Sequence, residues 1–249
     1  MINIKLGDKV YDGVTSVKLD TSDGGTVEFS PYEETFAAGK AEGVEEGQKA
    51  EYDKFWDAYQ DYGNRTEYST ARGNFGGKFW TDEIFKPKYP MNVTNGSSMF
   101  RQTGITDFTK DDIRLDFSKC TDMDYTFAYS GNVKLPFVDL SSATKTTQTF
   151  GELTSDSLTV KFSENTKILN PFVRMKKLVN LTVDGTVGMN ISFSDSSLLS
   201  SESVQSVIDH LKDLTGLTSQ TLTVHADVGA NMTESQKATI TAKNWTLVY

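Results

Sequence analysis

The sequence predicts an α+β protein with a small N-terminal β-meander, a glycine-spaced helix, a short solenoid with a parallel sheet, and a C-terminal α/β cap. Short alternating segments open the chain, a 13-residue pattern recurs four times in its middle, and capped helices alternate with apolar segments at its end. We therefore expect five regions: a β-rich attachment unit (1–34), a helical stalk (35–63), an irregular aromatic cap (64–90), the solenoid (91–197) and the α/β cap (198–249).

The N-terminal region alternates apolar and polar residues in three short segments, residues 2–6, 14–19 and 26–29. Asp12-Gly13 and Asp23-Gly24-Gly25 favour turns between these segments. A meander with so few apolar side chains buries little surface by itself. We expect it to attach to a partner or to pair across an oligomer.

Three glycines mark the helix predicted over residues 35–63. Gly39, Gly43 and Gly47 share one face, because residues four apart are neighbours on a helix. Each glycine costs about 1 kcal/mol of helix stability against alanine, so three in register favour a compensating close contact between helices. We expect a homo-oligomeric stalk, taken as a trimer; a flexible linker is the alternative.

Aromatic residues without a regular period follow the predicted stalk. Phe75, Phe79, Trp80 and Phe85 lie among Gly-rich turns. Aromatic side chains beside the end of a repeat array shield its first unit or form an exposed binding patch. Shielding is the interpretation that we favour.

The main signal is an internal repeat whose copies start at Leu115, Val138, Val160 and Leu181, with spacings of 23, 22 and 21 residues. The first, third and last positions of each copy are apolar, and a degenerate fifth copy ends at Phe100. Each copy predicts a short strand, a hydroxyl-rich turn and an inward phenylalanine. One copy cannot bury this face alone, so we expect stacked units with parallel strands and each phenylalanine on the next.

These residues resemble the BspA-like leucine-rich repeats of bacterial surface proteins. Leu115-Asp116-Phe117-Ser118 and Val138-Asp139-Leu140-Ser141 match the strand pattern, and residues 92–100, ending in Met99-Phe100, match a further copy. The resemblance covers about residues 88–195. The chain departs from the pattern by using Phe and Val where Leu is usual, and by lacking the Met before Phe in later units.

The layout of the whole chain is also similar to that of structural proteins encoded by phages and prophages of gut Firmicutes. This resemblance implies a protein of a virion or extracellular particle, with a bacterial cell surface as the alternative location. The implied partners are other particle proteins and a host-surface protein or glycan.

The C-terminal region predicts a helix, a strand, a second helix and a last strand. A serine cap precedes the first helix, whose apolar face comprises Val204, Val207, Ile208, Leu211 and Leu214, and Gly216 closes it. Residues 221–228 predict a strand, Thr233, Glu234 and Gln236 open the second helix, and residues 245–249 form the last strand. We expect this region to cap the open end of the solenoid, since unpaired strand edges invite aggregation.

Composition disfavours several function classes. The chain carries 25 Lys and Arg against 34 Asp and Glu, a net charge of −9 that disfavours nucleic acid as a partner. No apolar run reaches the roughly 18 residues of a membrane span. His210 and His225 lie outside any nucleophile motif, and Cys120 has no identifiable basic neighbour. We expect no catalytic residue, metal or cofactor.

The predicted binding residues flank the inward positions of the repeat strands and form two outward ladders: Arg114, Phe137, Thr159 and Asn180 in the first, and Asp116, Asp139, Lys161 and Thr182 in the second. A face of mixed polarity suits a peptide or a glycan; alternatively the repeat is only a spacer. We expect a non-enzymatic structural or binding protein of a phage or phage-like particle, in its tail, fibre or capsid surface, that presents the repeat for adhesion. A bacterial adhesin, a pure scaffold and, because aspartates are plentiful, a glycoside-cleaving enzyme are the alternatives.

Overall fold

The structure is a computed structural model that describes residues 4–6, 9–11, 17–20, 26–29, 75–78, 80–83, 85–87, 90–111 and 113–249. The chain divides into two compact units, residues 1–69 with 87–89, and residues 70–86 with 90–249. The described residues mix helices with parallel strands, which confirms the α+β class. The predicted stalk, with Gly39, Gly43 and Gly47, lies outside them. Within the described part of the chain, no helix is long and apolar enough to cross a membrane.

The first unit contains two hairpins. Strand β1 (Ile4–Leu6) pairs antiparallel with β2 (Lys9–Tyr11), and β3 (Val17–Asp20) pairs antiparallel with β4 (Thr26–Phe29). The described strands form two separate two-stranded sheets, so the prediction of one meander was wrong, and it missed β2.

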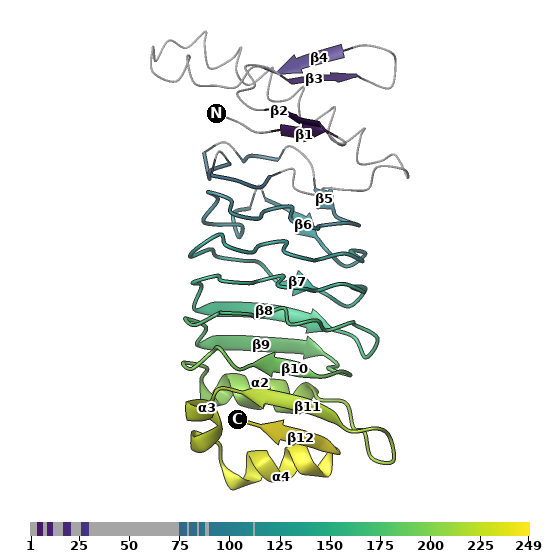
Figure 1. The fold of residues 1–249 in the computed structure, drawn as a ribbon, viewed down its shortest axis with the longest axis vertical. Helices are drawn as coiled ribbons and strands as arrows, with labels where there is room; N and C mark the ends of the chain where they lie inside the picture. The colour runs from purple at the N-terminus through teal and green to yellow at the C-terminus, as the bar shows by residue number, and fades with distance from the viewer. Residues whose placement is uncertain are drawn as a thin grey trace. The chain divides into compact units, whose positions relative to one another are not determined.

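The second unit contains the repeat, and its successive segments lie one above the next in Figure 1. Strand β5 (Met91–Asn92) pairs parallel with β6 (Leu115–Asp116). Strand β8 (Ser157–Phe162) pairs parallel with β7 (Val138–Asp139) on one side and β9 (Asn180–Gly185) on the other. The predicted parallel pairing of repeat strands is therefore confirmed for these pairs.

One phenylalanine from each segment lies in the core, at most 1% exposed. The ring centroids are 5.6 Å apart for Phe100 and Phe127, and 6.0 Å apart for Phe127 and Phe150. Phe172 follows at 5.6 Å from Phe150, and Phe193 at 4.8 Å from Phe172. This phenylalanine ladder, predicted from the last position of the repeat, is confirmed.

The ladder begins earlier than the repeat pattern indicates. Phe75 is fully buried, its ring lies 5.7 Å from that of Phe100, and its N–H donates to the Met99 carbonyl at 2.9 Å. Phe85 is also buried and lies edge-on to Phe100 at 5.5 Å. These two aromatic residues therefore shield the first predicted unit, as expected, while Phe79 lies outside the described residues.

Buried hydroxyl groups join neighbouring segments. Thr126 donates to the Gly96 carbonyl at 2.9 Å, and Ser130 donates to the Phe100 carbonyl at 2.7 Å. A buried hydroxyl without a partner would destabilise the fold. Each bond instead gives a buried hydroxyl its partner and joins two segments.

Helix α2 (Ser201–His210) covers the edge of β9, where a further strand would otherwise pair. The Ser203 hydroxyl accepts from the Leu181 N–H at 2.8 Å, and the Ser206 hydroxyl accepts from the Val183 N–H at 2.9 Å. Two edge donors of β9 are thus satisfied by serine side chains, which protects the edge from pairing with another chain.

A second parallel sheet closes the C-terminal region. Strand β11 (Gln220–Val224) lies between β10 (Ile191–Phe193) and β12 (Trp245–Val248), with the helices α3 (Ala226–Asn231) and α4 (Glu234–Ala242) between β11 and β12 in the chain. Figure 1 shows α2 and this sheet at the C-terminal end of the second unit.

The C-terminal predictions need two corrections. The strand predicted over residues 221–228 ends at Val224, because the His225 side chain accepts from the Asp227 N–H and opens α3. Helix α2 ends at His210, so Gly216, whose φ is +77°, lies in a later turn and does not close the helix. The predicted cap of α4 is confirmed, since Thr233 bonds the Gln236 backbone and Gln236 bonds back.

Candidate functional site

The predicted binding residues flank buried strand positions, and Phe137, the one apolar residue among the eight, is 47% exposed. Their register between β8 and β9 differs from the prediction: Thr159 lies opposite Thr182, Lys161 opposite Asp184, and Asn180 opposite Ser157. The strands align at a spacing of 23 residues, whereas Phe172 and Phe193 are 21 residues apart. The chain between β9 and Phe193 is therefore two residues shorter than the chain between β8 and Phe172, and an alignment without gaps cannot show this difference.

Several of the predicted binding residues on the outward face of the strands bond to each other or to the backbone. The Asp139 carboxylate lies 3.5 Å from the Lys161 ammonium and accepts from the Ser141 N–H at 2.8 Å. The Asn180 amide donates to the Ser157 hydroxyl at 3.3 Å. The polar groups of this face therefore serve to connect segments, and they converge on no shared point.

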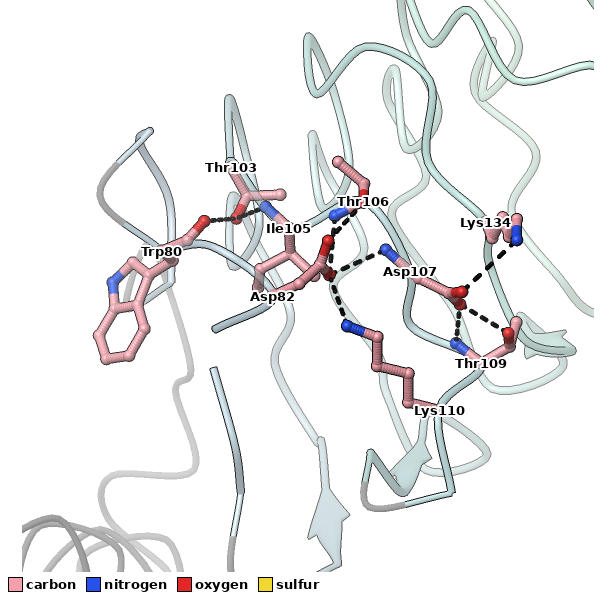
Figure 2. A network of polar contacts seen from close by, with 9 residues as sticks. All are labelled: Trp80, Asp82, Thr103, Ile105, Thr106, Asp107, Thr109, Lys110 and Lys134. Atoms are coloured by element: carbon pink, nitrogen blue, oxygen red, sulfur yellow. Dashed lines mark hydrogen bonds and ion pairs between the residues drawn. The ribbon is translucent and has the colours of Figure 1, made fainter. Parts of the chain in front are cut away.

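Polar contacts also connect segments at the start of the second unit (Figure 2). Asp82 accepts from the backbone N–H groups of Thr106 and Asp107, each at 3.1 Å, and from the Thr106 hydroxyl. Its carboxylate lies 3.5 Å from the Lys110 ammonium. Partial burial raises the pKa of Asp82, but the hydrogen bonds from Thr106 and Asp107 outweigh it and lower the pKa overall.

One segment later, Asp107 also pairs with a lysine of the next segment, but its hydrogen bonds come from its own turn, as Figure 2 shows. It accepts from the Thr109 N–H at 2.9 Å and the Thr109 hydroxyl at 2.6 Å, and it lies 3.6 Å from the Lys134 ammonium. The Thr109 bonds lower the pKa of Asp107. The half-buried Trp80 joins the network through its carbonyl, which accepts from Thr103 at 3.3 Å.

These contacts bear on the glycosidase alternative. Asp116 accepts from the Ser118 N–H at 2.8 Å, Asp122 from the Asp124 N–H at 3.2 Å, and Asp124 from the Thr147 N–H at 2.6 Å. The Ser118 bonds lower the pKa of Asp116. A glycosidase needs a carboxylic acid whose pKa is raised, whereas the pKa of Asp116 is lowered.

The side chains of Cys120, His210 and His225 also bond to the backbone. Cys120 is buried, its thiol donates to the Asp122 carbonyl at 3.3 Å, and burial raises its pKa to about 12. A thiol with this pKa is a poor nucleophile at neutral pH. The His210 ring bonds the Ser206 carbonyl, and His225 caps α3. No group of three or more His, Cys, Asp or Glu side chains within the described ranges could hold a metal ion.

A second surface, which the sequence did not indicate, surrounds the phenylalanine ladder. Two non-glycine residues with φ between 50° and 63° flank each ladder phenylalanine from Phe100 to Phe172, two positions before it and two after it. These residues, here called the turn ledge, are Ser98 and Gln102, Tyr125 and Tyr129, Gln148 and Glu152, and Asn170 and Arg174.

Positive φ is unfavourable for residues with a side chain, so each ledge position requires compensation. The Tyr125 N–H donates to the Thr147 carbonyl and the Tyr129 N–H to the Gly151 carbonyl, both at 2.8 Å in the next segment. The N–H of Phe127, between them, donates to Thr149 at 2.9 Å. The backbone of the turn ledge is thus bonded from segment to segment as strands are in a sheet.

Side chains on the turn ledge hold one another in place. The Arg101 guanidinium lies over two rings, 5.5 Å from the centroid of Tyr125 and 5.1 Å from that of Tyr129. The Tyr129 hydroxyl donates to the Gln148 side chain at 3.2 Å. One step further, Glu152 accepts from Arg174, which raises the pKa of that guanidinium.

The turn ledge is therefore an ordered strip of aromatic and planar polar side chains. The gapless alignment of the repeat already places Tyr125, Gln148 and Asn170 at one position. It could not reveal that this position has positive φ, because none of the three is glycine. Comparison with protein-family models, curated proteins and solved structures finds no match to this chain.

Proposed function

We propose that this chain is a non-enzymatic binding protein in which a leucine-rich-repeat solenoid over residues 91–197 presents a surface for adhesion. The observation that carries the proposal is the regular inter-segment bonding around the phenylalanine ladder, which holds surface side chains of successive segments at matched positions. Preorganised side chains bind with a smaller loss of conformational entropy. The acidic residues near them bond the backbone, which favours binding over glycoside cleavage.

We further propose that the protein belongs to a phage or phage-like particle, as a component of its tail, fibre or capsid surface. This assignment rests on the resemblance to BspA-like repeats and to structural proteins of phages from gut Firmicutes. The particle's other proteins and a host-surface protein or glycan are then its partners. The alternatives are an adhesin of a bacterial cell surface and a scaffold that binds nothing outside the particle.

Adhesion can be tested with the fluorescently labelled full chain and intact cells of several gut Firmicutes. Saturable binding to at least one strain, lost when the chain is unfolded by heat, is the expected result. Absence of binding to every strain would contradict adhesion and favour the scaffold. Release of reducing ends from cell-wall glycans during the same incubation would favour the glycosidase instead.

The homo-oligomer is tested separately, by light scattering on the full chain and on a shortened chain that starts at Asn64. A defined oligomer for the full chain and a folded monomer for the shortened chain would support assembly through residues 1–63. Two monomers would contradict it.

A further inference from the structure

We propose that Arg101, Tyr125 and Tyr129 form a receptor for the carboxylate of an acidic glycan, a sugar chain that contains uronic acid residues. This inference rests on the proposed adhesive function and assigns it a surface and a ligand class. The strand face that the sequence indicated does not form part of this receptor.

The first step of the argument is the state of the Arg101 guanidinium. Among the described residues, Lys110, Lys134, Lys145 and Lys161 each have an aspartate within 4.0 Å, and Arg174 has Glu152. Arg101 is exposed and has no such carboxylate within the described part of the chain; its contacts are the two tyrosine rings. A guanidinium that stacks on rings keeps its N–H donors in its own plane, available to a carboxylate.

The second step is the rigidity of the receptor. Tyr125 and Tyr129 stand on turn-ledge positions whose backbone N–H groups are bonded to the next segment. The Tyr129 hydroxyl is held by Gln148. The rings therefore hold the arginine before a ligand arrives, so that less conformational freedom is lost on binding.

The third step selects the ligand class by charge. A net charge of −9 repels dense polyanions, so Arg101 suits a short ligand with no more than one carboxylate per unit and several neutral hydroxyls beside it. Gln148 lies one segment and Asn170 two segments further along the turn ledge, and their side-chain amides offer planar polar groups to sugar hydroxyls. An acidic sugar chain has both features.

The fourth step favours a glycan over an acidic peptide. Extended peptides gain affinity from unpaired backbone groups of the protein. On the turn ledge the N–H groups of Tyr125, Phe127 and Tyr129 already donate to Thr147, Thr149 and Gly151. Recognition there has to come from side chains, and sugars are bound in that way.

The test is a titration of the full chain with trigalacturonate, followed by calorimetry, with maltotriose as the neutral probe and triglutamate as the acidic peptide. We expect binding of trigalacturonate alone, and about a tenfold loss of affinity in Arg101→Gln, since a charge-assisted hydrogen bond contributes that much or more. Lys119→Gln, which removes the same charge from an exposed position after β6, should bind as the wild type does. Tyr129→Leu should also weaken binding, because the ring positions the arginine.

Three results would overturn the inference: no binding of trigalacturonate by the wild type, equal binding of triglutamate, or unchanged affinity in Arg101→Gln. Thermal unfolding of each variant confirms that it is folded. Adhesion to intact cells separates the two proposals. If Arg101→Gln adheres as the wild type does, the adhesive function stands and this receptor is wrong; if the wild type does not adhere, the adhesive function itself fails.

Discussion

Phe150 occupies the middle of the phenylalanine ladder, fully buried between the rings of Phe127 and Phe172. Phe150→Ala should lower the free energy of unfolding by about 3–5 kcal/mol, because it removes a buried ring and leaves a cavity. Urea unfolding measures this loss. Phe137→Ala is the matched control, because Phe137 is 47% exposed and should change stability by no more than about 0.5 kcal/mol. Equal losses would contradict the ladder as the core of the fold.

Also at the scale of single residues, Cys120 makes a contribution to the stability of the fold that depends on pH. Burial raises the pKa of its thiol from 9.0 to about 12, so the unfolded chain releases the proton near pH 9 while the folded chain keeps it. The contribution is therefore constant below pH 9 and is lost as the pH rises toward 12. Between about pH 8 and pH 10, the wild type should lose about 1 kcal/mol more stability than Cys120→Ala. Urea unfolding measures the stability of each protein at both pH values, and equal losses in the two proteins would contradict this prediction. The loss is taken within each protein, so any effect of the alanine that does not depend on pH cancels.

At the scale of elements, α2 takes the place of a strand beside β9, and Ser203 is the residue that makes this possible. It accepts from the Leu181 N–H and donates to the Val179 carbonyl at 2.9 Å. Ser203→Ala leaves the Leu181 N–H without its partner, while the Val179 carbonyl keeps its bond from the Ser200 N–H at 2.9 Å. The variant should lower stability by about 1–3 kcal/mol, with faster hydrogen exchange at Leu181. Ser201→Ala, at an exposed position of the same helix, should leave both quantities nearly unchanged. An unprotected Leu181 amide in the wild type would show that α2 does not cover the edge.

At the scale of the whole molecule, the C-terminal region keeps the repeat from extending into another chain. Removing residues 201–249 would expose the edge of β9 and leave β10 without its partner β11. We expect this shortened chain to aggregate, because open strand edges pair with each other. Light scattering during refolding measures it, with the full chain as the control. A soluble, folded, monomeric product would mean that the repeat needs no cap.

Some features of the fold could be predicted from the sequence, and others could not. Phe100 to Phe193 and the strands before them were predictable, because burial imposes the same residue types on each segment. Residues 225–228 were assigned to a strand, since the sequence does not show that His225 bonds the backbone as a helix cap. The turn ledge was missed because Tyr125 and Tyr129 belong to no known positive-φ pattern, and only bonds to the next segment stabilise their conformation.

The sequence by itself determined the α+β class, the parallel pairing of repeat strands and the phenylalanine ladder, because these follow from periodic burial. The tertiary structure alone decided the register of β8 and β9, the covering of β9 by α2, and the meeting of Arg101 with two tyrosine rings. Each of these depends on contacts between residues more than 20 positions apart, whose geometry depends on how adjacent segments stack. A linear pattern records which residues are buried, but it does not record which exposed residues become neighbours.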